Sequence, residues 1–146
     1  MSEHPENFEV IARAVVVQNG KILLCRAKEK GHYFFPGGHV EKGERTEIAL
    51  KREFLEELGA RIGKTAFIGA VENIFRDSYE HHEINLVFEA EVFQYEFKSR
   101  EDHLEFELLS LDEFAGKKVL PVSLKKAVAE WLKDKKIFWR SESRES

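Results

Sequence analysis

The sequence predicts a single α/β (α+β) domain in which helices pack against a mixed β-sheet. Segments rich in β-branched and aromatic residues stand on both sides of an amphipathic segment with helical periodicity. The length of 146 residues suits one domain. With tyrosine left out and glycine added, the apolar fraction is about 46%, within the ~45–50% usual for globular domains. We therefore expect residues 1–146 to form one domain, with flexible tails at 1–7 and 141–146.

The chain before the first helix is predicted to form β-structure. Residues 8–18 and 21–28 are rich in valine, isoleucine and leucine. The dipeptide Asn19-Gly20 between them predicts a tight hairpin, because both of its turn positions require positive φ. A short aromatic strand at residues 33–35 is expected to end at Pro36. The glycine-rich residues 37–43 lack hydrophobic periodicity and predict a loop.

A helix is predicted over residues 45–58, followed by alternating strands and further helical segments. Gly59 stands where a left-handed C-terminal cap belongs. Strands are expected at 67–75, at 83–93, where apolar and polar residues alternate, and at 104–109. A polar connection spans 94–103. Ser110 is suited to cap a short turn at 111–115, and Pro121 precedes a second helix at 123–135.

Charge and cysteine content narrow the functional classes. The 23 basic and 27 acidic residues give a net charge of −4, which disfavours binding to nucleic acid backbones. A single cysteine fits a reducing compartment and leaves no internal disulfide. No apolar run reaches ~18 residues, and the polar, acidic start does not resemble a signal peptide. We expect a cytoplasmic protein without membrane contact, and a homodimer is left open.

The first helix carries an excess of negative charge on one face. On a helical wheel, Glu53, Glu56 and Glu57 gather opposite an apolar arc that includes Leu50 and Leu55. Like charges at these spacings repel each other, and the nearby C-terminal end of the helix also disfavours anions. Neighbouring basic residues could compensate, which would make this a solvated acidic face. A hard cation such as Mg²⁺, which prefers carboxylate oxygens, is the alternative.

The preceding loop favours the cation. Gly37 and Gly38 allow the backbone to approach a ligand closely, and their carbonyl groups can bind a hard cation. Glycines before a helix with an exposed carboxylate face form a plausible cradle for a metal–pyrophosphate complex.

These residues resemble the Nudix box, the signature of the Nudix hydrolases. The family writes it G-x5-E-x7-R-E-U-x-E-E-x-G-U, where U is a bulky aliphatic residue. All seven charged and glycine positions match at the correct spacing, whereas Phe54 and Ala60 depart from the aliphatic preference. The matching positions are Gly38, Glu44, Arg52, Glu53, Glu56, Glu57 and Gly59.

The resemblance implies a Nudix-type α/β/α sandwich that hydrolyses a nucleoside diphosphate linked to another moiety. It implies that Glu53, Glu56 and Glu57 bind Mg²⁺ or Mn²⁺, with the Gly37 carbonyl as a further ligand. Arg52 and Glu44 would pair and hold the loop against the helix. Two simpler roles stay open: Arg52 could only neutralise the glutamates, and Glu44 could only act as an anion at the helix N-terminus.

The general base has several candidates. Within the box, Glu53 or Glu56 is favoured. Family members also draw the base from a later loop, where the candidates here are Glu101, Asp102 and Glu105. Glu83, which follows two histidines, is another candidate, and ordinary surface charge is the alternative role of all four.

For substrate contacts, Gly38, His39 and Tyr79 are the candidates. Aromatic side chains could stack on a base, and the candidates for this are Phe34, Phe35, Phe75 and Tyr79. The adjacent residues His81 and His82 should point to opposite faces of a strand.

The expected substrate is a small nucleotide. By elimination we favour a nucleoside triphosphate, an oxidised one included, giving the monophosphate and pyrophosphate. A dinucleoside polyphosphate or a nucleotide sugar is the alternative substrate, although the proline typical of ADP-ribose-cleaving relatives is missing beyond the box. A non-catalytic nucleotide-binding module is a further alternative, which the intact box disfavours.

Overall fold

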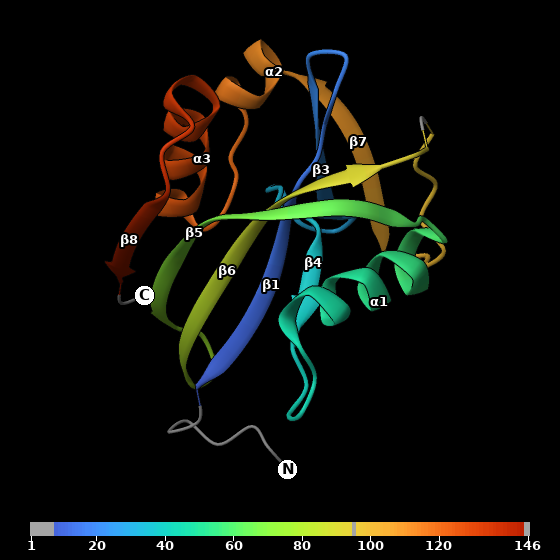
Figure 1. Cartoon of the computed structure of the whole chain (residues 1–146). Helices are drawn as coiled ribbons and strands as arrows, with labels where there is room; N and C mark the ends of the chain where they lie inside the picture. The colour runs from blue at the N-terminus through green and yellow to red at the C-terminus, as the bar shows by residue number, and fades with distance from the viewer. Residues whose placement is uncertain (1–7, 95, 145–146) are drawn as a thin grey trace.

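The computed structural model describes residues 8–94 and 96–144 and contains two β-sheets with three helices (Figure 1). The larger sheet is mixed, because β1 runs parallel to β6 and β5 runs parallel to β8, whereas β4–β1 and β5–β6 are antiparallel. In spatial order its strands are β4 (Gly37–His39), β1 (Glu9–Val15), β6 (Glu80–Val92), β5 (Ile62–Arg76) and β8 (Phe138–Ser143).

The smaller sheet is antiparallel and contains the predicted hairpin. Its strands are β2 (Val17–Gln18), β3 (Lys21–Ala27) and β7 (Leu104–Ser110), in that order. Asn19 and Gly20 form the turn between β2 and β3 with φ of 50° and 76°, as the dipeptide predicts. Since β2 follows β1 after one residue, the same stretch of chain joins the two sheets.

The helices begin and end close to the predicted positions. Helix α1 (Thr46–Leu58) ends at Gly59, which adopts the left-handed conformation with φ of 64°. Helix α2 (Leu111–Gly116) starts with a capping box, in which Ser110 and Glu113 each accept a hydrogen bond from the other's backbone nitrogen. Helix α3 (Val122–Asp134) buries Leu124 and Trp131.

Helices α1 and α3 cover opposite faces of the larger sheet (Figure 1). Residues of β1 whose side chains point to opposite faces accordingly lie in two different hydrophobic cores. Ala12 and Ala14 pack in one core with Leu50 and Phe54 of α1. Val15 lies in the other core, which includes the buried residues of α3. Cys25 is buried in the α1 core, as expected of an apolar strand position.

Several sequence expectations were wrong. Residues 37–39 of the predicted loop form the edge strand β4, because Gly37 and Gly38 pair with β1. Residues 141–143 of the predicted tail belong to β8, where they pair with β5. The aromatic strand at residues 33–35 makes only isolated bridges, at Tyr33 and Phe34. Leu55 is exposed rather than part of the apolar face of α1. The predicted tail at 1–7 lies outside the described residues.

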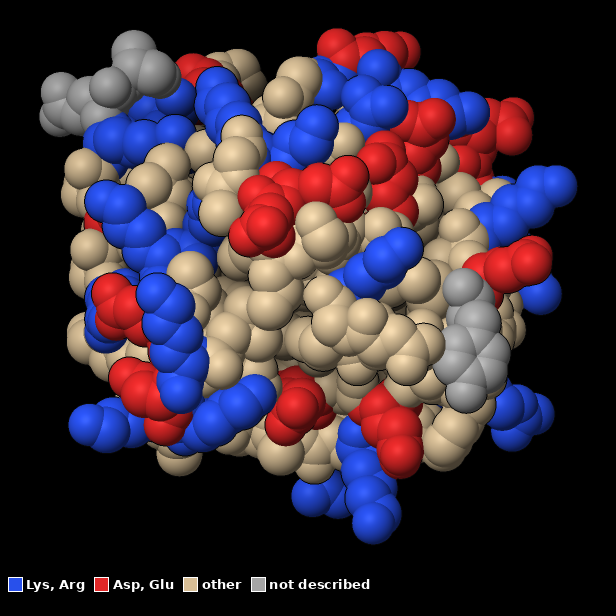
Figure 2. All heavy atoms as spheres, turned by 90° about the horizontal axis from the view of Figure 1, so that it is seen from above, with Lys and Arg blue, Asp and Glu red and all other residues tan. Residues whose placement is uncertain are grey.

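Charged side chains of both signs are interspersed over the face shown in Figure 2, around an area of uncharged residues. This agrees with the near balance of acidic and basic residues in the sequence. No helix in the described part of the chain has the length and apolar character required to cross a bilayer.

Candidate functional site

The acidic face of α1 lies against the edge strand β4. A Cβ atom at position 38 would overlap the carboxylate group of Glu53, so only glycine leaves room for that carboxylate beside the strand. The Glu53 side chain is 15% exposed, whereas that of Glu56 is 57% exposed. Gly38 and Glu53 of the box therefore lie in direct contact.

Arg52 connects this helix to the loop before it. Its Nε and Nη2 atoms donate to the two oxygens of Glu44, at 2.7 and 3.0 Å. Nη2 also donates to the carbonyl oxygen of His39 at 3.1 Å, while Nη1 donates to Glu53 at 3.2 Å and Glu56 at 3.3 Å. The guanidinium thus joins α1, β4 and the loop in one network.

Glu44 is held by the loop and by Arg52 rather than by the start of the helix. Its carboxylate also accepts a hydrogen bond from the backbone nitrogen of Glu41 at 3.0 Å, and α1 has no side-chain N-cap. The hydrogen bond from Arg52 is the main cause that lowers the pKa of Glu44. The expected Arg52–Glu44 pair is therefore present in the structure.

Glu57 is a carboxyl group with a strongly raised pKa. Burial raises its pKa to about 8, and both a hydrogen bond to Glu53 and the charges of Glu53 and Glu101 act in the same direction. Arg13 opposes this effect. A carboxyl group in these surroundings favours its protonated form.

The donor set suits a hard divalent cation, since carboxylate and carbonyl oxygens are the ligands that Mg²⁺ and Mn²⁺ prefer. Among the residues described, no three His, Cys, Asp or Glu side chains already converge on one point. Glu56 instead contacts Arg52, and Glu57 lies beside Glu53. Binding a cation would therefore require these side chains to turn toward a shared centre.

The later loop reaches the C-terminal end of α1. The backbone nitrogen of Arg100 donates to the carbonyl oxygen of Glu57 at 2.7 Å, and the Arg100 guanidinium lies beside Gly59. Glu101 is close enough to raise the pKa of Glu57. The loop thus brings one of the proposed base residues near the acidic cluster.

The other candidate bases are placed differently. Glu101, Asp102 and Glu105 line a cavity of about 360 Å³. Glu105 forms an ion pair with Arg26 at 2.6 Å. Glu83 lies on β6, where it accepts a hydrogen bond from Asn73 at 3.4 Å.

His39 and Tyr79 are linked through a chain of polar contacts. Glu9 contacts the His39 ring at 2.9 Å and the His81 ring at 2.7 Å. The Tyr79 ring packs on His81, with 4.6 Å between the ring centres. The second nitrogen of His81 contacts Asp77 at 3.0 Å, so both nitrogens of this ring face carboxylates and its pKa is raised. These contacts thus join His39 of β4 to Tyr79, which precedes β6, through Glu9 of β1 and His81 of β6.

The aromatic residues that were candidates for stacking on a base differ in burial and in their contacts. Phe35 is fully buried in the core, so the prediction that it could stack on a base was wrong. Phe34 is half-buried, with the Arg13 guanidinium 5.8 Å from its ring centre. Phe75 stacks on His81. His82 contacts Glu72 at 2.6 Å, whereas His81 contacts Glu9, in agreement with the expected opposite orientations.

Sequence reasoning missed three polar residues of the sheet interior: Arg13, Asn73 and Asn85. Asn73 and Asn85 are buried, and Arg13 donates to Asn85 at 3.2 Å. The signal that could have found them is a polar residue in the middle of a strand that is otherwise apolar.

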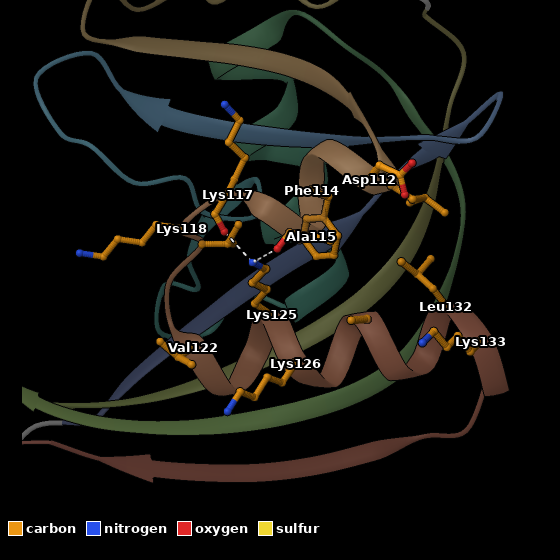
Figure 3. Close-up of a pocket in the computed structure, with 13 residues that line it drawn as sticks. Asp112, Phe114, Ala115, Lys117, Lys118, Val122, Lys125, Lys126, Leu132 and Lys133 are labelled. Atoms are coloured by element: carbon orange, nitrogen blue, oxygen red, sulfur yellow. Dashed lines mark hydrogen bonds between the residues drawn. The ribbon is translucent and has the colours of Figure 1, made fainter.

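A cavity of about 650 Å³ lies elsewhere, between α2 and α3 (Figure 3). Apolar side chains such as Phe114 and Val122 line it together with five lysines. One of them, Lys125, donates to the carbonyl oxygens of Ala115 and Lys117 at 2.9 and 2.6 Å. None of the lining residues belongs to the box, so the carboxylate cluster is the better candidate site.

Comparison with known proteins finds a matching family model and relatives that match parts of this chain. The family model of the NUDIX domain matches residues 9–133. An ADP-ribose pyrophosphatase of Methanocaldococcus jannaschii is 34% identical over 70% of this chain and 62% of its own length. A putative 8-oxo-dGTP diphosphatase, YtkD of Bacillus subtilis, is 41% identical over 47% of this chain and 40% of its own. The chain thus spans less than two thirds of either relative.

Solved structures share the fold. A MutT protein from Bacillus halodurans superposes with a TM-score of 0.75 at 18% identity, covering 93% of this chain and 91% of that one. A MutT NUDIX hydrolase from Burkholderia pseudomallei has a TM-score of 0.69 at 28% identity, covering 82% and 96%.

Proposed function

Since the chain belongs to the NUDIX domain family, we propose that it hydrolyses a pyrophosphate bond in a nucleoside diphosphate linked to another moiety. One observation carries this proposal. Arg52 holds Glu44, Glu53 and the β4 backbone in place, while Glu57 is left with a raised pKa beside other carboxylates. A divalent cation bound there would stabilise the ionised form of these carboxylates.

Glu53, Glu56 and Glu57 would hold Mg²⁺ or Mn²⁺, with the Gly37 carbonyl as a further ligand. A cation bound there neutralises pyrophosphate oxygens and lowers the pKa of a water molecule. Arg52 and Glu44 position the loop, and Gly38 leaves the space that Glu53 occupies. The Arg52–Glu44 pair and Gly38 together hold the carboxylates beside β4, where a pyrophosphate group can approach.

A carboxylate must also accept the proton of the attacking water. Glu53 and Glu56 are the candidates within the box. Glu101 is the best supported of the later ones, because it lies close enough to Glu57 to affect its pKa. Glu105 is less suited, since Arg26 already pairs with it.

For the substrate we propose a nucleoside triphosphate, including an oxidised one, that yields the monophosphate and pyrophosphate. The similarity to the putative 8-oxo-dGTP diphosphatase YtkD supports this choice. A nucleotide sugar is the second candidate, because the relative named ADP-ribose pyrophosphatase matches 70% of this chain. A dinucleoside polyphosphate is the third candidate substrate.

A panel of nucleotides with Mg²⁺ or Mn²⁺ tests the proposal. Phosphate release after addition of inorganic pyrophosphatase detects triphosphate cleavage, whereas release after addition of a phosphomonoesterase detects ADP-ribose cleavage. We expect turnover of at least one member, and its loss in Glu56→Gln. No turnover of any nucleotide, together with unchanged nucleotide binding in Glu56→Gln, would indicate a non-catalytic module.

A further inference from the structure

The side chain of His39 lies on the face of β4 opposite to Gly38. Gly38 is paired with Ala12 of β1, which packs in the core of α1, whereas His39 is paired with Ile11. Because successive residues of a strand point to opposite faces, the His39 ring points away from α1. Strand β4 is an edge strand, so a ligand that reaches Glu53 beside Gly38 can extend over this edge toward His39. The His39 side chain is 64% exposed and is open to such a ligand.

Glu9 holds one nitrogen of the His39 ring. Its two carboxylate oxygens contact Nε2 of His39 at 2.9 Å and Nδ1 of His81 at 2.7 Å. Burial alone would raise the pKa of Glu9, but the two rings outweigh this effect and the pKa is lowered. Since an ionised carboxylate only accepts hydrogen bonds, both ring nitrogens donate to it. The Nδ1 atom of His39 has no hydrogen bond to any described residue and remains available to a ligand.

His81 in turn fixes the position of Glu9. Its Nε2 atom contacts the two carboxylate oxygens of Asp77 at 3.0 and 3.1 Å. Its ring is stacked on Phe75 at an angle of 9°, and the Tyr79 ring packs on it as well. Burial opposes protonation of His81, but the hydrogen bonds to Glu9 and Asp77 raise its pKa. The ring cannot turn without breaking both contacts and the stacking.

We propose that Glu9 and His81 are positioning residues of the candidate active site, where His81 fixes Glu9 and Glu9 orients the His39 ring toward the substrate. The inference rests on the proposed function and on His39 as a substrate contact. A ring that is already oriented loses less conformational freedom on binding than a free, exposed side chain. Loss of the support should therefore weaken substrate binding rather than the chemical step, which raises KM with little change in kcat.

Strand β6 carries a second histidine that provides a matched control. His82 Nε2 contacts Glu72 at 2.6 Å on the face of the strand opposite to His81. The side chains of Glu72 and Glu9 are 26% and 25% exposed, so the two carboxylates are buried to the same extent. Glu72 also accepts a hydrogen bond from Ser141 of β8, on the far side of the sheet from β4. The His82–Glu72 pair therefore resembles the first pair chemically but does not support β4.

Steady-state kinetics with the best nucleotide of the panel tests the proposal. Glu9→Gln leaves one acceptor for two rings, and His81→Phe keeps an aromatic ring but loses both polar contacts. We expect each to raise KM about 3- to 10-fold, the usual effect of one lost hydrogen bond. In a protein that already carries His39→Ala, Glu9→Gln should change KM less than about twofold, because Glu9 acts only through that ring. Glu72→Gln and His82→Phe should leave KM unchanged.

NMR of the histidine rings in the ¹⁵N-labelled, metal-free protein tests the orientation apart from catalysis. Glu9→Gln and His81→Phe should shift or broaden the ring signals of His39, whereas His82→Phe should leave them unchanged. His39→Ala identifies these signals by their loss. Circular dichroism shows which variants are folded, and Glu9→Gln decides the test if His81→Phe is not.

An unchanged KM in Glu9→Gln would overturn the inference and leave the proposed function standing. Additive effects of Glu9→Gln and His39→Ala would also overturn it, as would equal rises of KM in Glu72→Gln and His82→Phe, since both pairs would then only support the fold. If no nucleotide is hydrolysed while the His39 signals respond to Glu9→Gln, the proposed function fails and the support of the His39 ring by Glu9 is confirmed.

Discussion

Arg52 holds the Glu44 carboxylate with two nitrogens, at 2.7 and 3.0 Å, across eight residues of sequence. Two hydrogen bonds from one planar group to one carboxylate define an orientation as well as a distance. Because the same guanidinium also contacts Glu53 and the His39 carbonyl, the orientation of Arg52 controls the geometry of the carboxylate cluster.

Replacing Arg52 with lysine should therefore reduce activity although the charge is kept. Lysine cannot reproduce the two-nitrogen contact, so the loop and the helix lose their alignment. We expect kcat/KM to fall on the order of 10- to 100-fold, as small misplacements in active sites do. Steady-state kinetics with the best substrate of the panel measures this, and activity equal to the wild type would show that Arg52 supplies only charge.

Gly38→Ala should disable the site by displacing Glu53. The added methyl group would overlap the Glu53 carboxylate, whereas Gly31→Ala places its methyl group in open space and is the matched control. We expect Gly38→Ala to lose most of kcat and Gly31→Ala to keep it. Circular dichroism of both variants checks that the fold is intact. Full activity of a folded Gly38→Ala would contradict the placement of Glu53 against β4.

Glu56→Gln and Glu57→Gln should lose most of kcat while folding normally. If the carboxylates hold a cation, Mg²⁺ raises the thermal midpoint of the wild type by binding only the native state, and it raises that of the variants less. Without metal, each variant should be as stable as the wild type or more stable, because repulsion among the carboxylates is relieved. A large loss of stability without metal would point to a structural role instead.

The metal-free protein should lose stability as the pH rises from about 4.5 to about 8. The folded state raises the pKa of Glu57 to about 8 from an ordinary value of 4.5, so the folded protein binds more protons than the unfolded chain in this range. The free energy of unfolding contributed by Glu57 is thus fully present below pH 4.5 and lost as the pH passes through the folded pKa.

Urea denaturation with EDTA at several pH values measures this effect, with Glu57→Gln as the comparison. The wild type should lose more stability than Glu57→Gln between the two pH limits. Parallel pH profiles for the two proteins would mean that Glu57 ionises normally in the folded state.

Local sequence patterns predicted much of this fold. The Asn19-Gly20 turn, the cap at Gly59 and the capping box at Ser110 depend on neighbouring residues only, and the structure agrees with all three. The resemblance to the Nudix box implied that Arg52 and Glu44 would pair, and the structure contains this pair. The loop expected at residues 37–39 was wrong, because the pairing of β4 with β1 is a contact between strands.

The sequence by itself determined which residues form the carboxylate helix, since an α-helix places side chains three and four residues apart on one face. Only the tertiary structure decided which strands lie side by side. Arg13 and Asn85 are 72 residues apart and meet because β1 and β6 are neighbours in the sheet. In the same way, only the folded chain brings the Arg100 backbone to the end of α1 and Asn73 to Glu83. The order of strands in a sheet depends on contacts between distant segments of the chain, so local sequence periodicity cannot predict it.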